Sequence, residues 1–96
     1  MYVLVTYDVS TMDKAGQKRL RKIAKICLTY GQRVQHSVFE MKLDPAQWSV
    51  CSTTLVETID PDTDSIRFYH LGNHWAERID HHGVRKDHNI DGFLEI

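Results

Sequence analysis

The residues most able to do chemistry are one carboxylate and a cluster of cations that follows it closely. Asp8 ends an apolar, β-branched run that begins at Tyr2. Six of the twelve Lys and Arg residues then fall within residues 14–25, namely Lys14, Lys18, Arg19, Arg21, Lys22 and Lys25. A carboxylate can ligate a hard cation such as Mg²⁺, and clustered cations can contact a polyanion. The combination indicates phosphodiester chemistry or nucleic-acid binding.

Asp8 alone would be a weak metal site, because Mg²⁺ takes six oxygen ligands, of which one or two usually come from protein carboxylates. Two copies of Asp8 meeting across the two-fold axis of a homodimer would suffice. They would repel each other and titrate as a coupled pair until a cation bound, and water on that cation could then attack a phosphodiester. The alternative is that Asp8 only caps the following loop through Asx-type hydrogen bonds. Spacing alone favours this alternative.

Five of the clustered cations recur at helical spacing on one face of a predicted helix, and Arg19 falls at the border of its apolar face. The predicted helix, residues 14–30, contains no Asp or Glu that could pair with them. Such a face either follows a phosphate backbone, with binding that weakens steeply with salt, or is an ordinary solvated surface. Both interpretations stay open.

Charge is distributed unevenly along the chain. Residues 1–42 carry eight basic and three acidic side chains, whereas residues 43–96 carry four and ten. The basic half can bind phosphates, and the acidic half would repel them. The alternative is that mixed charge only keeps a small protein soluble. The six histidines match no zinc spacing, and Cys27 and Cys51 are typical of core residues in a reducing compartment. With no signal sequence and no membrane-spanning run, we expect a cytoplasmic protein that does not bind membranes.

The first helix has the clearest pattern. Its apolar residues recur at steps of three and four and comprise Leu20, Ile23, Ala24, Cys27 and Leu28. Ser10, Thr11 and Asp13 are candidate turn and N-cap residues before it, and Gly31 is expected to end the helix in a left-handed conformation. A second helix should start at Asp44-Pro45-Ala46-Gln47, which has the pattern of a capping box.

The remaining segments are extended. A strand is expected at residues 2–8, an extended segment of the sheet over 32–43 with a bulge or kink near Gln35-His36-Ser37, and further strands at 65–71 and, more weakly, at 75–80. The order β-α-β-β-α-β predicts one α+β domain over residues 1–96, ferredoxin-like, with its first strand central and beside the strand that follows the second helix. The terminal run Phe93–Ile96 can add a further strand, and residues 84–96 are expected to pack on, or exchange with, a partner subunit.

Two strings, Val5-Thr6-Tyr7-Asp8-Val9 and Gly31-Gln32-Arg33-Val34-Gln35-His36-Ser37-Val38-Phe39-Glu40, closely resemble the CRISPR-associated protein 2 family, and the resemblance continues through the basic helix. It implies a ferredoxin-like homodimer whose C-terminal strand joins the partner's sheet. It further implies a role in spacer acquisition, bridging two dimers of the CRISPR integrase (the CRISPR-associated protein 1 family). Many members are described as Mg²⁺-dependent endonucleases that cut single-stranded RNA or double-stranded DNA.

The resemblance also assigns residues. It implies that Asp8, next to Tyr7, holds Mg²⁺ or Mn²⁺ between the two subunits, and it assigns functional roles to Arg19, Arg21, Arg33 and Phe39. We expect Asp8, Tyr7 and Arg33 to be catalytic, with Arg33 either gripping a phosphate or fixing the Asp8 loop. Ser37 bonds either to phosphate or only to backbone. Phe39 is expected at the dimer interface rather than stacked on a base.

Two other functions remain compatible with the sequence. One is a non-catalytic scaffold of the same fold, which holds prespacer DNA and docks the integrase. The other is a stand-alone RNA-binding or toxin-like ferredoxin fold. The fold itself decides between none of these.

Overall fold

The computed structural model describes residues 1–72. Its elements are β1 (Tyr2–Asp8), α1 (Lys14–Tyr30), β2 (Gln32–Gln35), β3 (Val38–Lys42), α2 (Pro45–Thr58) and β4 (Ser65–Leu71). The predicted β-α-β-β-α-β order is therefore confirmed. The strand expected at 75–80, the terminal run Phe93–Ile96 and the segment 84–96 lie outside the described residues.

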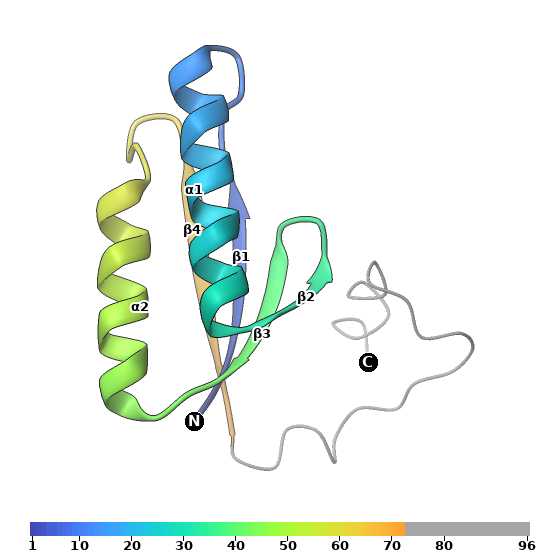
Figure 1. The fold of residues 1–96 in the computed structure, drawn as a ribbon, viewed down its shortest axis with the longest axis vertical. Coiled ribbons are helices and arrows are strands. Elements are labelled where there is room, and N and C mark those ends of the chain that lie inside the picture. The colour runs from blue at the N-terminus through green and yellow to red at the C-terminus, as the bar shows by residue number, and fades with distance from the viewer. Residues whose placement is uncertain (73–96) are drawn as a thin grey trace, which may run out of the picture.

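The four strands form one sheet in the order β2-β3-β1-β4. Strand β1 is antiparallel to both of its neighbours, β3 and β4. Each helix crosses over a strand that lies between the two it connects, which is the split βαβ arrangement of a ferredoxin-like fold. Figure 1 shows both helices on one face of the sheet, with β1 running behind α1. The predicted central position of β1, beside the strand that follows α2, is confirmed.

The two faces of the sheet have separate apolar clusters. On the helix-covered face, alternate residues of β1, namely Val3, Val5 and Tyr7, pack with α1 and α2. On the other face Leu4 and Val38 form a smaller cluster with the partly buried Val34, Tyr69 and Leu71. The alternation read from residues 2–8 is therefore confirmed, and it places Asp8 on the helix-free side.

Helix α1 begins and ends where its pattern predicts. The Asp13 carboxylate accepts a hydrogen bond from the Gly16 amide at 2.7 Å, which caps the helix. Ile23 and Cys27 are fully buried, but Leu28 is 56% exposed, which corrects its placement on the apolar stripe. The reason is angular, because a residue that directly follows Cys27 turns about 100° away from the packed side of the helix.

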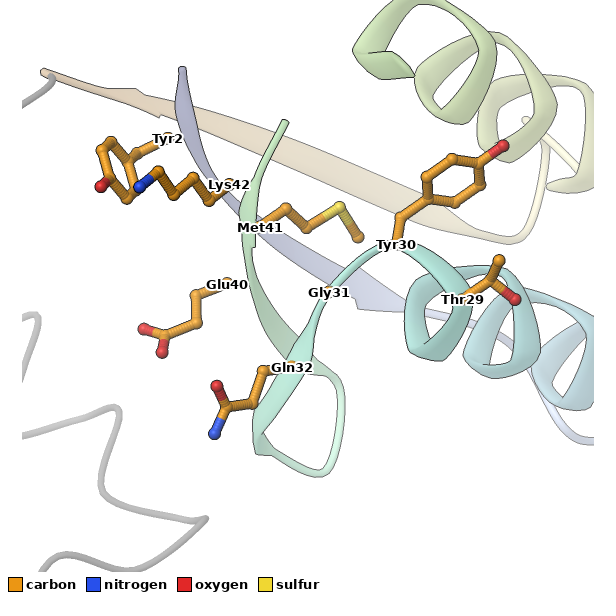
Figure 2. A pocket seen from close by; sticks show the side chains of 8 residues that line it. All are labelled: Tyr2, Thr29, Tyr30, Gly31, Gln32, Glu40, Met41 and Lys42. Atoms are coloured by element: carbon orange, nitrogen blue, oxygen red, sulfur yellow. The ribbon is translucent and has the colours of Figure 1, made fainter. Parts of the chain in front are cut away.

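Gly31 is needed for space and not for a left-handed conformation. Its φ of −151° is extended, contrary to the prediction, and its amide still caps the helix by donating to the Cys27 carbonyl at 2.8 Å. A Cβ at Gly31 would lie 2.5 Å from Met41 Cγ and 2.6 Å from the Glu40 carbonyl oxygen. The chain thus passes straight from α1 into β2 against β3, as Figure 2 shows.

The extended segment 32–43 differs from the prediction. Its bulge lies earlier, between Arg33 and Gln35, and residues 36–37 form a turn, so the segment is two antiparallel strands, β2 and β3, and not one bent strand. Asp44 and Gln47 form the expected capping box of α2. Neither helix within residues 1–72 has the length and apolarity that crossing a bilayer requires.

Candidate functional site

Asp8 is exposed at the end of β1, on the face of the sheet that the helices leave open. The backbone of Asp8 pairs with Ser65, the first residue of β4. Two residues later, the Ser10 amide donates to the Asp64 carboxylate at 3.0 Å. The segment around Asp8 is therefore held by the sheet on one side and by a buried acid on the other, while its own carboxylate faces solvent.

The turn between β2 and β3 reaches the same end of β1. The Tyr7 amide donates to the Ser37 carbonyl at 3.1 Å, and the Tyr7 hydroxyl donates to the His36 carbonyl at 3.5 Å. The backbone of Ser37 thus contacts the strand beside Asp8, and this contact does not decide whether the Ser37 hydroxyl bonds to phosphate or to backbone. The turn at 36–37, the start of β4 and the exposed acid together form the candidate site.

Tyr7, Arg33 and Phe39 gather on the opposite side of β1 from Asp8. The Tyr7 and Phe39 rings stack with centroids 6.2 Å apart, and the Arg33 guanidinium lies over the Phe39 ring with its Cζ 5.1 Å from the centroid. Phe39 is completely buried within its own subunit. Its predicted position at a dimer interface is therefore wrong: the alternation with Met41 and Leu43 that suggested an interface reflects packing under the helices.

Tyr7 is a neutral hydrogen-bonding group in this setting. Burial raises the pKa of its phenol, the nearby Cys27 thiol raises it further, and the Arg33 guanidinium partly opposes both. Because Tyr7 and Asp8 are neighbours on one strand, their side chains point to opposite faces. The structure therefore does not bring the Tyr7 hydroxyl and the Asp8 carboxylate together within a subunit.

Arg33 is partly buried and packs against an aromatic ring. Its Nε is buried and has no hydrogen-bond partner among residues 1–72. The guanidinium stacks on Phe39 instead, an arrangement that favours arginine over lysine. Of the two expected roles, gripping a phosphate or fixing the Asp8 loop, the described contacts place Arg33 next to Tyr7 and not in the loop that follows Asp8.

The cations of α1 divide into two groups. Five are exposed on the side of the helix that faces away from the sheet, namely Lys14, Lys18, Arg21, Lys22 and Lys25. Arg19 is different, because its Nε lies 2.8 Å from the Asp64 carboxylate and its Nη2 lies 3.3 Å from the other carboxylate oxygen. The acid that pairs with Arg19 comes from the segment before β4, so the absence of acids within the helix could not exclude such a pair.

A single subunit provides few ligands for a cation. Within residues 1–72, no three His, Cys, Asp or Glu side chains come close enough to hold a metal ion together. The donor chemistry at Asp8 suits Mg²⁺ or Mn²⁺, which prefer carboxylate oxygen, but one monodentate acid leaves the coordination incomplete. The site therefore fits a metal only if another molecule supplies further ligands.

Asp64 is the residue that the sequence interpretation missed. It is the buried charged residue of the part of the chain that the structure describes, with 9% of its surface exposed. The residues before it, Asp60-Pro61-Asp62, indicate from the sequence only that the second helix ends there. The acid directly before a strand was a usable signal for a buried cap, but no pattern could have shown that Arg19, 45 positions earlier, would reach it.

A shallow pocket of about 390 Å³ lies at the other end of β1, far along the strand from Asp8. Figure 2 shows it beside the passage from α1 into β2, with Met41 pointing toward Tyr30 and with Lys42 next to Tyr2. The Lys42 Nζ lies 5.5 Å from the centre of the Tyr2 ring. Because Tyr2 and Asp8 stand at opposite ends of a seven-residue strand, this pocket is separate from the candidate site.

Comparison with known proteins identifies the family and the fold. Residues 1–79 match the family model described as CRISPR associated protein Cas2. The chain is 52% identical over 94 residues to the CRISPR-associated endoribonuclease Cas2 of Chlorobaculum tepidum, an alignment that covers 98% of each chain. It is 45% identical over 91 residues to the CRISPR-associated endonuclease Cas2 of Halalkalibacterium halodurans, which covers 95% of each.

A solved structure agrees. The crystal structure of Streptococcus pyogenes Cas2 at pH 6.5 superposes with a TM-score of 0.75 at 54% identity, covering 86% of this chain and all of that one. The fold of this chain is thus shared with a solved Cas2 structure. The chain belongs to the Cas2 family.

Proposed function

We propose that this protein acts in CRISPR adaptation as a homodimer, and that it is a metal-dependent endonuclease centred on Asp8 of both subunits. The observation that carries the proposal is the exposed Asp8 carboxylate, fixed at the end of the central strand of a Cas2-family sheet. Relatives named endoribonuclease and endonuclease support phosphodiester cleavage, with RNA or DNA as the substrate.

The homodimer follows from what one subunit lacks. One Asp8 leaves a metal site incomplete, and a two-fold axis near it would add a second carboxylate. The helices cover only one face of the sheet, whereas the opposite face carries partly buried apolar side chains, namely Val34, Tyr69 and Leu71. Pairing through that face buries apolar surface and brings the Asp8 side of each subunit toward the other.

Each group would have a distinct task in cleavage. A Mg²⁺ or Mn²⁺ ion between the two Asp8 carboxylates would supply Lewis acidity and activate water. The exposed cations of α1 would bind the phosphate backbone, with a salt dependence that reflects their number. Arg33, which stacks on Phe39 beside Tyr7, would hold the β2–β3 turn and its Ser37 against the end of β1.

The second candidate is a non-catalytic dimeric scaffold that bridges the CRISPR integrase and holds prespacer DNA. It is favoured by the incomplete ligand set of the single subunit within residues 1–72. In this function the α1 cations still contact nucleic acid, but Asp8 only shapes the end of the strand.

Asp8→Asn separates the two functions, because it keeps the shape of the side chain and removes its charge. Metal-assisted charge stabilisation of several kcal/mol predicts that cleavage with Mg²⁺ or Mn²⁺ falls by roughly 10²-fold or more. Nucleic-acid affinity and its salt dependence should be retained, because the α1 cations are unchanged. Asp62→Asn, an exposed acid in the turn before β4, is the matched control and should cleave like the wild type.

Spacer acquisition in cells that carry a repeat array completes the test. If Asp8→Asn abolishes both cleavage and acquisition, the nuclease is part of adaptation. If acquisition persists without cleavage, the scaffold is the function that adaptation uses. A wild-type protein that cuts neither RNA nor DNA with either metal, across pH, refutes the endonuclease proposal.

A further inference from the structure

Asp64 forms the densest hydrogen-bond cluster around any side chain of the described part of the chain. Its carboxylate accepts from the Ser10 amide at 3.0 Å, from the Asp60 amide at 2.9 Å and from the Thr63 hydroxyl at 3.1 Å. Arg19 adds Nε at 2.8 Å and Nη2 at 3.3 Å. The carboxylate therefore ties together the loop after β1, helix α1 and the turn before β4.

These contacts surround the main chain next to Asp8. Asp64 directly precedes Ser65, whose backbone pairs with Asp8, and Ser10 lies two residues beyond Asp8. The Asp8 segment is thus fastened to the same short stretch twice, first through the strand pairing and then through the Asp64 carboxylate. Without the second link, the chain would be free to turn away from β4 as soon as β1 ends.

The negative charge of Asp64 is stabilised by its hydrogen-bond partners inside the cluster. The Arg19 guanidinium and the Asp60 and Ser10 amides hold the pKa of this carboxyl well below its usual range, against the opposing effect of burial. An ionised acid whose oxygens already accept five hydrogen bonds has little capacity to ligate a metal ion. The guanidinium group of Arg19 in turn points its Nε and Nη2 at a carboxylate and not at solvent.

We propose that Asp64 is a positioning residue for Asp8, and that Arg19 is the counter-ion of Asp64 and not a phosphate contact. The Asp64 carboxylate fixes the Ser10 amide and thereby the point at which Asp8 leaves the sheet. The inference rests on the proposed function in one respect only, that Asp8 acts in cleavage. It corrects the expected nucleic-acid role of Arg19.

Asp64→Asn tests the proposal, since the amide keeps the volume but must present a donor toward Arg19 or a backbone amide. Misplacing a reacting group by about 1 Å can cost up to 10²-fold in rate, so we expect kcat to fall 10- to 100-fold. The concentration of Mn²⁺ for half-maximal cleavage should rise, with KM for nucleic acid changed less than about twofold. Amide hydrogen exchange at Ser10 should become at least about tenfold faster.

Controls separate positioning from loss of folding. Asp62→Asn makes the same chemical change two residues away and should leave every readout unchanged. Rates are taken per folded molecule below the unfolding temperature, and a lower folded fraction alone does not shift the Mn²⁺ midpoint. If Asp64→Asn does not fold, Arg19→Lys keeps the charge, loses the two-pronged contact and should show the same changes at smaller size.

The outcomes are distinct. Faster Ser10 exchange with unchanged kcat and Mn²⁺ midpoint overturns the positioning role. Arg19→Gln that weakens nucleic-acid binding about tenfold and lowers the salt slope by about one overturns the counter-ion role. If the wild type never cleaves nucleic acid, the proposed nuclease function is refuted. The inference is then decided by amide exchange at Ser10 and by Mn²⁺-induced broadening of the Asp8 signals. If both are the same in Asp64→Asn as in the wild type, the positioning role of Asp64 is refuted.

Discussion

Gly16 is the residue at which one added methyl group should disturb the candidate site most directly. It is buried in the first turn of α1, where its amide donates to Asp13. A Cβ there would overlap the Ser10 carbonyl oxygen and would lie 2.9 Å from the Ser10 carbonyl carbon. The obstacle is main chain, so it cannot rotate away as a flexible side chain would.

The expected cost follows from two opposing effects. Real Cβ atoms stay at least 3.0 Å from other heavy atoms, and the Ser10 carbonyl oxygen is well inside that limit. Ser10 would therefore have to move by more than about 1 Å, and overpacking of this kind costs roughly 1–3 kcal/mol. Alanine gains at most about 1 kcal/mol over glycine in a helix. Because Ser10 is also held by Asp64, we expect Gly16→Ala to lose about 2 kcal/mol net, which corresponds to a fall in Tm of roughly 8–16 °C for a domain of this size.

Urea and thermal unfolding at fixed protein concentration measure this change, since the stability of a dimer depends on concentration. Gly72→Ala is the matched control, because a Cβ at Gly72 meets nothing within 4 Å and should change stability by less than about 0.5 kcal/mol. A Gly16→Ala protein as stable as the wild type, or more stable, would show that the loop after Asp8 moves to accommodate the added methyl group without a cost in stability. The close packing argued for this loop would then be wrong.

Two further predictions concern titratable groups. Burial raises the pKa of Cys27 to about 12 and that of Cys51 to about 11, so the native protein should not react with a thiol reagent at pH 8. The unfolded protein should react at both thiols. Rapid reaction of the native protein would contradict this prediction. The folded pKa of Asp64 lies below the unfolded value of about 3.9, so its contribution to stability is complete above that pH and is lost as pH falls toward the folded pKa. Measured by urea unfolding, the free energy of unfolding should therefore fall more steeply between about pH 4 and pH 2 in the wild type than in Asp64→Asn. Equal pH dependence in the two proteins would exclude Asp64 as the cause of the loss of stability in acid.

Local chemistry made much of the fold predictable. The N-cap at Asp13, the capping box at Asp44 and the strand at 65–71 each depend on residues that are close in sequence. The split βαβ order then fixed β1 at the centre of the sheet, because each crossover helix needs a strand between the two it joins. These elements carry enough local preference that tertiary packing does not override them.

Long-range contacts account for what the sequence could not provide. Gly31 has the residue type of a left-handed helix end, but the proximity of β3 is what requires it. Phe39 alternates as an interface strand would, yet the helices above it bury it completely. Arg19 belongs by spacing to a basic stripe, but Asp64 captures it across 45 positions of sequence. In each case the deciding partner lies on another element.

The placement of Asp8 and of the α1 cations determines how the molecule can meet a nucleic acid. Asp8 ends β1 on the helix-free face, whereas the exposed cations lie on the far side of a helix that covers the other face. One subunit therefore cannot present its acid and its basic stripe to the same phosphate. If the helix-free faces pair, the acids meet at the interface and the basic stripes remain outside, so binding and cleavage become separable properties. For that reason Asp8→Asn should retain binding, and a large loss of affinity in that variant would show that the acid and the cations share one surface.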